Sequence, residues 1–137
     1  MKKIYWDNRG NAILEFALVF PVFIALILGT INIAVLLHSD IMAASAARTG
    51  GRTAAVTGDR EKGEAKARKL LEDFGLVSTK NKVSITSPDT EYVTATVTCR
   101  VPVVAPGFAA LFGGKAWDNE ITLTESYQYY VEFRHRR

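Results

Sequence analysis

The chain has 137 residues, of which 48% are hydrophobic and 23% charged. This length suits one ordinary domain, or a smaller domain with an anchor, and excludes two large domains. The net charge is +3, but Lys2, Lys3, Arg9 and Asp7 place much of it in the first ten residues, and most of the chain is nearly neutral. This distribution argues against a nucleic-acid binder. The single cysteine, Cys99, excludes an intramolecular disulfide and a cysteine-based metal site.

Residues 16–37 form an uncharged apolar run, FALVFPVFIALILGTINIAVLL. As a helix, this run would extend about 33 Å, which is enough to cross a hydrocarbon core of about 30 Å. No other segment is comparably long and apolar, so we expect one membrane span at most. Basic residues precede the run and Asp40 is the first charge after it. This asymmetry predicts a cytoplasmic N-terminus and an extracytoplasmic chain from about Ser39 onward.

A cleavable secretory signal is an alternative reading of the same run. The stretch Ala44-Ser45-Ala46 offers small residues of the kind found at signal cleavage sites. Secretory signals have apolar cores of about 7 to 15 residues, however, and this run is longer. An uncleaved signal anchor also remains open.

The block RGNAILEFAL, residues 9–18, joins the basic leader to the span. The leader ends at Gly10, and Glu15, the fifth residue after it, stands at the head of the apolar run. A carboxylate costs about 2–3 kcal/mol if it lies deep in lipid. Glu15 could reach the headgroups or stay protonated, or it could serve in packing between subunits.

This block resembles the processing site of type IV pilin-like proteins. The continuation resembles the TadE-like minor pseudopilins of the Flp/Tad pilus system, in which a Glu-Phe-Ala-Leu run leads into a span interrupted by proline. Here Glu15 and Phe16 begin that run, Pro21 interrupts the span, and the small, arginine-containing stretch 43–52 follows. The resemblance covers roughly residues 9–56.

The resemblance implies that a membrane aspartyl prepilin peptidase cleaves between Gly10 and Asn11 on the cytoplasmic side. Gly10 would allow an extended or left-handed backbone just before the helix. The freed ammonium of Asn11 can then pair with Glu15 of the same or a neighbouring subunit. The implied partners are prepilin peptidase, other Tad pilins and pseudopilins, the inner-membrane pilus assembly platform and membrane lipid, with no nucleic acid.

The span should continue as a helix through residues 11–56. Pro21 lacks the N–H that would bond the carbonyl of Ala17, so we expect a kink there, although membrane spans tolerate proline. Thr30 and Asn32 can bond the helix backbone or a partner helix. Beyond the span, a helix face of Ala, Gly and Ser permits close packing of other elements. The glycine pair at 50–51 is expected to weaken the helix, and Thr57-Gly58-Asp59 is its expected end.

The remaining residues, 57–137, predict a small extracytoplasmic domain. A second helix is expected from an N-cap at Asp59 to a stop at Gly75. The period then changes to two, in short runs around 83–85, 93–101 and 121–133, the last interrupted by Glu125. We therefore predict an α+β fold: a long N-terminal transmembrane helix that continues into a domain with a second helix and a three-stranded antiparallel sheet, covered by helix on one face.

An apolar insertion, residues 102–117, separates the second and third expected strands. Four large side chains in it need cover: Phe108, Leu111, Phe112 and Trp117. They could pack onto their own domain, or they could form a contact patch for another pilus component or the membrane surface. Cys99 falls on the apolar parity of its strand, which favours a buried small hydrophobe over a reactive thiol.

The sequence contains no phosphate loop, no nucleophile elbow and no histidine–carboxylate spacing with metal geometry. We therefore expect no catalytic residues, no cofactor, no metal and no enzymatic activity. The resemblance therefore implies an accessory structural protein of a bacterial inner membrane, made of a cleavable leader (1–10), a helix (11–56) and a periplasmic domain (57–137). The alternative is a signal-anchored extracytoplasmic binding or enzymatic domain unrelated to pili.

Overall fold

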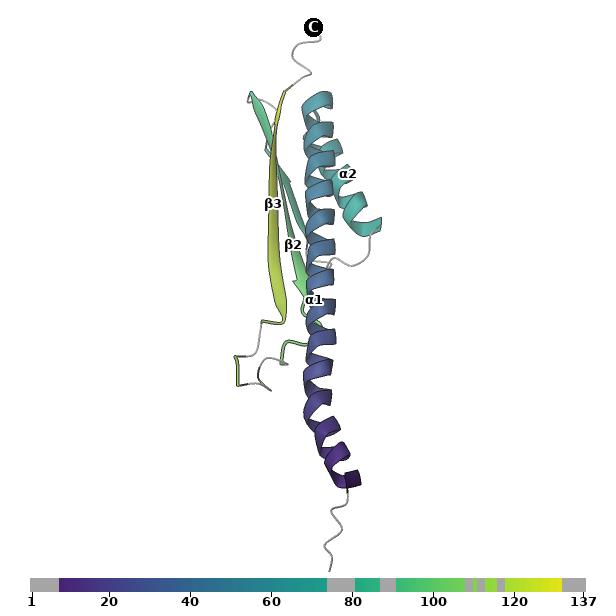
Figure 1. Cartoon of the computed structure of the whole chain (residues 1–137). Helices are drawn as coiled ribbons and strands as arrows, with labels where there is room; N and C mark the ends of the chain where they lie inside the picture. The colour runs from purple at the N-terminus through teal and green to yellow at the C-terminus, as the bar shows by residue number, and fades with distance from the viewer. Residues whose placement is uncertain are drawn as a thin grey trace, which may run out of the picture.

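The computed structural model describes residues 8–73, 81–86, 91–107, 110, 113–115 and 118–131. Its elements follow the order α1 (Asn8–Thr57), α2 (Arg60–Asp73), β1 (Lys82–Ile85), β2 (Tyr92–Pro102) and β3 (Glu120–Tyr130). Figure 1 shows α1 as the long axis of the described chain, with the sheet and α2 packed along its distal half. The described part is thus a rod with a domain built around one end, which confirms the predicted α+β fold.

Helix α1 is a single element of 50 residues. It runs unbroken through Gly50 and Gly51, where we expected weakness, and ends at Thr57 as the sequence predicts. Gly58 follows with a φ of 70°, and its N–H donates to the carbonyl of Ala54 at 2.9 Å. A glycine in the left-handed region can close the last turn in this way without a steric penalty, which explains the sharp end of the helix.

Helix α2 begins at the predicted cap. The Lys62 N–H donates to Asp59 Oδ1 at 3.1 Å, and this hydrogen bond lowers the pKa of the Asp59 carboxyl. One turn further on, Glu64 Oε1 accepts from Arg60 Nε at 2.8 Å and from the Ile85 N–H at 3.3 Å. Glu64 therefore ties α2 to strand β1. The buried face of α2 consists of Gly63, Ala67 and Leu71.

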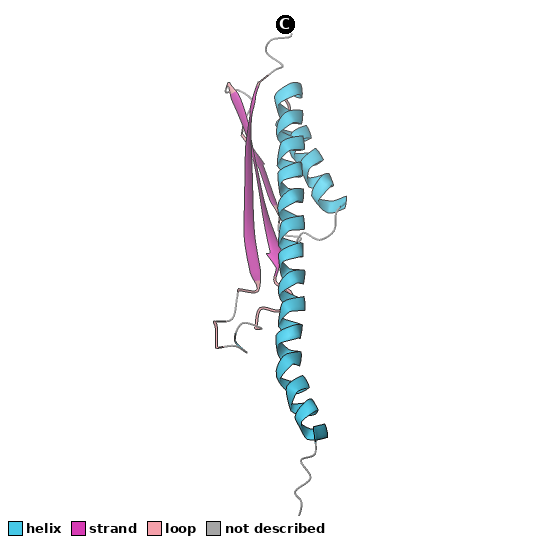
Figure 2. Cartoon of the chain, viewed as in Figure 1, coloured by secondary structure: helices cyan, strands magenta, loops and turns pink. Residues whose placement is uncertain are grey.

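The three strands form one antiparallel sheet in the order β1-β2-β3. In the centre of the register Val97 lies opposite Val83 on β1 and Glu125 on β3. Strand β2 alternates between buried and less buried side chains along its length, as the period of two predicts. Figure 2 shows the helices on one side of this sheet, so the buried parity faces α1. The buried side chains of β2 are Val93, Ala95, Val97, Cys99 and Val101.

The contact face of α1 is made of small residues. Alanines dominate it, and each of Ala43, Ala46, Ala47 and Ala54 is fully buried. Gly50 and Gly63 face each other across the two helices so closely that a Cβ on Gly63 would lie 2.7 Å from the Gly50 carbonyl oxygen. Without side chains at this crossing, the two backbones can approach each other directly. We refer to the buried small residues of α1 as the small-residue stripe: Ala43, Ala46, Ala47, Gly50, Gly51, Ala54 and Ala55.

We predict that Gly63→Ala destabilises the domain. Alanine normally stabilises a helix interior by about 1 kcal/mol relative to glycine. Here its Cβ would collide with the Gly50 carbonyl and lie 2.9 Å from Ala54 Cβ, and overpacking of this kind costs about 1–3 kcal/mol. Denaturant unfolding of the detergent-solubilised chain, followed by circular dichroism, should show a lower midpoint. Gly29→Ala is the control, because a Cβ there meets nothing within 4 Å; a higher midpoint for Gly63→Ala would contradict the packing.

Candidate functional site

The N-terminal half of α1 exposes its large apolar side chains. Leu18 is 77% exposed and Phe16 67%, and none of the most apolar stretch of the helix is buried within the protein. Within the described residues, α1 is the one helix long and apolar enough to cross a membrane. A continuous apolar surface of this size marks a lipid or protein contact. Thirteen large residues share this exposure with Leu18: Ile13, Leu14, Phe16, Val19, Phe20, Val22, Phe23, Leu26, Ile27, Ile31, Ile33, Leu37 and Ile41.

The predicted processing residues lie at the start of this half. Helix α1 begins at Asn8, so Gly10 and Asn11 belong to its first turn. The sequence analysis placed the start of the helix at residue 11, after a Gly10 that would allow an extended or left-handed backbone. The described helix begins three residues earlier and includes Gly10, so the expected start was wrong. The backbone hydrogen-bonding of a helix extends over any sequence that lacks a breaker, and one glycine costs only about 1 kcal/mol. A protease that cuts at this bond would have to unwind the first turn.

Glu15 and Phe16 lie one turn further along. The Glu15 side chain is exposed, and among the described residues it forms no ion pair. The Phe16 ring packs against the Phe20 ring with centroids 5.3 Å apart. Within the described part of the exposed half, Glu15 is thus the one carboxylate, and it stands at the head of a surface of large apolar side chains.

Pro21 lies inside α1, which continues past it. The purple N-terminal end of the helix curves away from the line of the rest in Figure 1. A proline removes one backbone hydrogen bond of the helix, but the predicted kink at Pro21 itself stays a prediction.

The polar residues of the span are satisfied in different ways. Thr30 Oγ1 donates to the Leu26 carbonyl at 2.8 Å, so this hydroxyl bonds its own helix, one of the two arrangements that the sequence allows. Asn32 is only 7% exposed, and its Oδ1 accepts from the Val104 N–H at 2.8 Å. The sequence did not point to this contact, because the two residues are 72 positions apart.

The candidate contact patch belongs to the insertion between β2 and β3. Phe108, Leu111, Phe112 and Trp117 lie outside the described residues, so the choice between packing on their own domain and contact with a partner stays open. The described residues just before them are apolar, and Val104 is 53% exposed.

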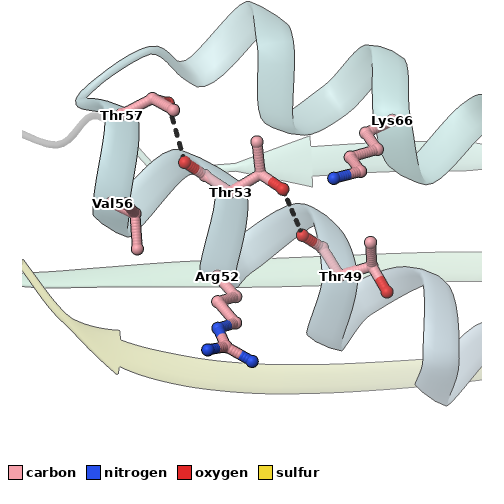
Figure 3. A pocket seen from close by; sticks show the side chains of 6 residues that line it. All are labelled: Thr49, Arg52, Thr53, Val56, Thr57 and Lys66. Atoms are coloured by element: carbon pink, nitrogen blue, oxygen red, sulfur yellow. Dashed lines mark hydrogen bonds between the residues drawn. The ribbon is translucent and has the colours of Figure 1, made fainter.

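An open hollow beside α1 and α2 is lined by threonines, a valine and two basic side chains (Figure 3). Its volume is about 460 Å³. The hydroxyls of Thr53 and Thr57 donate back to the carbonyls of Thr49 and Thr53, at 2.8 and 2.7 Å. No carboxylate, thiol or imidazole lines it, so the lining offers no general acid–base pair. Within the described residues the lining is Thr49, Arg52, Thr53, Val56, Thr57 and Lys66.

Other chemistry-bearing groups are structural in the described chain. Arg48 donates to the Tyr127 hydroxyl at 2.9 Å, and its guanidinium lies 4.7 Å from the centre of that ring, which braces α1 against β3. Cys99 is fully buried, and this burial raises the pKa of its thiol, as expected for a small hydrophobe. No cluster of His, Cys, Asp and Glu among the described residues could hold a metal ion.

Comparison with protein families gives a match over the exposed part of α1 and the beginning of its packed part. Residues 10–52 match the family described as TadE-like protein. This segment, about a third of the chain, is similar to TadE-like proteins. The match begins at Gly10, includes the exposed half of α1 and ends at Arg52, within the small-residue stripe. Comparison with curated proteins and with solved structures finds no match.

The exposed half of α1 predicts tight membrane association of the chain. After alkaline carbonate extraction, the wild-type chain should remain in the membrane pellet. Leu26→Arg combined with Ile27→Arg places two cations near the middle of the span, at about 3 kcal/mol each on insertion scales, and should move the chain toward the soluble fraction. Thr122→Arg together with Ser126→Arg, on the exposed parity of β3, is the matched control and should stay in the pellet. Release of the wild type would contradict a membrane span.

Proposed function

We propose that this TadE-like chain is a minor pseudopilin, an accessory structural protein for assembly of a Flp/Tad-type pilus. It is processed by prepilin peptidase between Gly10 and Asn11. It resides in the bacterial inner membrane as a single-pass protein with its domain in the periplasm, and it meets other Tad pilins and the inner-membrane assembly platform. It acts by interaction rather than by catalysis.

The observation that carries this proposal is the combination of one exposed apolar helix half with a single carboxylate at its head. The match to the TadE-like family covers the same segment, residues 10–52. The exposed side chains give the helix a surface for lipid and for other apolar helices. Glu15 adds a charge at one defined height on that surface, so it can set the register between neighbouring helices.

Cleavage changes the electrostatic setting of Glu15. In the described chain the first turn of α1 contains no acidic residue. Removal of residues 1–10 places Glu15 about one turn from the new N-terminus, where a carboxylate interacts favourably with the helix dipole by about 0.3–1 kcal/mol. The freed ammonium of Asn11 lies four residues from Glu15, a spacing at which side-chain groups meet on a helix. The same ammonium is also available to Glu15 of a neighbouring subunit.

The geometry of α1 disfavours the secretory-signal alternative. A cut after Ala46 would sever the helix inside the small-residue stripe, where Ala46 and Ala47 are fully buried. The released domain would lose part of the helix against which its sheet packs. A cut at Gly10 leaves the whole packed region intact.

N-terminal mass analysis of the chain from native membranes tests the proposal. We expect a mature chain that starts at Asn11, because prepilin peptidase removes the leader. Glu15→Ala should still be cleaved and inserted but should lose pilus assembly, measured by electron microscopy and by pilin in the sheared fraction. Glu72→Ala, an exposed carboxylate on α2, is the matched control and should assemble normally.

The outcomes separate the alternatives. An intact Met1 would favour an uncleaved anchor, and a start near Ala47 would mean ordinary secretion; either result contradicts the proposal. Normal assembly with Glu15→Ala would remove the role of the carboxylate in setting register.

A further inference from the structure

The connection that leaves β2 lies beside the membrane span. The Val104 N–H donates to Asn32 Oδ1 at 2.8 Å, and Asn32 belongs to the uncharged run 16–37. Figure 1 shows the chain leaving the foot of β2 and passing below the sheet, alongside α1. The segment Pro102–Gly107, which we call the foot loop, therefore reaches the level of Asn32 rather than stopping at the end of the domain.

Helix geometry gives the depth of that level. From Glu15 to Asn32 an α-helix rises about 25 Å, against a hydrocarbon thickness of about 30 Å. With Glu15 at one boundary of the hydrocarbon, Asn32 lies about 5 Å inside the other. The first charge beyond the span, Asp40, lies about 12 Å further along the helix. The foot loop thus meets α1 at a height where the span is still surrounded by lipid.

The composition of the foot loop suits this depth. Its sequence, PVVAPG, carries no charge and no polar side chain, and Val104 is 53% exposed. Irregular backbone is tolerated in lipid only where its polar groups are satisfied. Pro102 and Pro106 have no N–H to satisfy. The N–H of Val103 donates to the Asn119 carbonyl at 3.0 Å and that of Val104 to Asn32. Four of the six backbone nitrogens of the foot loop, the two prolines included, are thus either hydrogen-bonded or without a hydrogen to donate, and those of Ala105 and Gly107 are the other two.

We propose that the foot loop enters the domain-side leaflet of the membrane beside α1, with Val104 against lipid acyl chains and Asn32 holding the loop to the span. The loop covers Asn32, whose amide would otherwise face hydrocarbon at a cost. The chain then contacts the bilayer at two places, which fixes the rotation of the domain about the axis of α1. This inference rests on the membrane anchoring within the proposed function, but not on processing or pilus assembly.

Site-directed fluorescence on the full-length chain in vesicles of phosphatidylethanolamine and phosphatidylglycerol tests the depth. In a Cys99→Ala background, an environment-sensitive probe is attached to the thiol of Val104→Cys. Quenching by nitroxides on the lipid acyl chains is compared with quenching by aqueous iodide. The lipid reference is Ile33→Cys, at the level of Asn32 and 59% exposed; the water reference is Ser126→Cys, on the exposed parity of β3.

We expect the probe at Val104 to be quenched by lipid nitroxide as strongly as the probe at Ile33, and to resist iodide. Asn32→Ala, which removes the acceptor, should reduce the lipid quenching at Val104 and leave that at Ile33 unchanged. Circular dichroism verifies that each variant keeps its helix and sheet content.

Three results would overturn the inference. Iodide quenching at Val104 equal to that at Ser126 would place the loop in water, and shielding from both quenchers would mean that protein covers it. Unchanged lipid quenching at Val104 in Asn32→Ala would remove the tethering role of Asn32. If the probe at Ile33 were itself quenched by iodide and not by lipid, the anchoring would fail and with it the proposed function, which distinguishes that failure from failure of the foot-loop proposal alone.

Discussion

The close contact between the backbone of α1 and the elements around it is the constraint on which the rest of the structure depends. Alanine and glycine fill the side of α1 that faces α2 and the sheet, and at Gly50 and Gly63 there is no room for a Cβ. Small side chains bury little apolar area, so most of the buried apolar area that stabilises the domain has to come from the elements packed against α1. Those partners are the larger buried residues of the sheet and its end, Ile85, Val93, Val97 and Val131. Helix α1 thus contributes a surface of small residues, and the sheet contributes the larger side chains that pack against it.

This arrangement lets one helix serve two environments. Beyond Glu15, its exposed half presents large apolar side chains, as a lipid-facing helix requires. The distal half is buried at Ser39 and along the small-residue stripe. Because α1 is continuous between the two halves, a displacement of the membrane end would be transmitted to the domain as a rigid-body movement. The match to the TadE-like family spans the exposed half and most of the stripe. This part of the chain contains both the surface suited to lipid and the surface that packs against the domain. In the proposed function, Glu15 would set the height of this rod relative to its neighbours, and the domain would follow.

Much of this fold can be predicted from the sequence because its signals are local. The uncharged run 16–37 indicates a span by length alone, Asp59 and Gly58 mark the junction of the helices, and the alternation from Val93 to Val101 gives the central strand its buried face. The failures involve information that is not local. The sequence marks Gly50 as a weak point of the helix, since propensity counts only the cost of glycine, whereas tertiary packing against Gly63 uses the missing side chain. The contact between Asn32 and Val104 joins residues far apart in sequence, and no periodicity reports it. The expected helix start at residue 11 was also wrong, because the described helix extends back through Gly10 to Asn8.

Hydrogen–deuterium exchange of the full-length chain in lipid nanodiscs is the most direct test of the central claim that the span and the domain share one helix seated on the small-residue stripe. The account predicts slow amide exchange without interruption from the span through Ala55, because the helix has no hinge and its distal half is locked against β2 and α2. A fast-exchanging segment around residues 38–42, between a protected span and a separately protected domain, would contradict it.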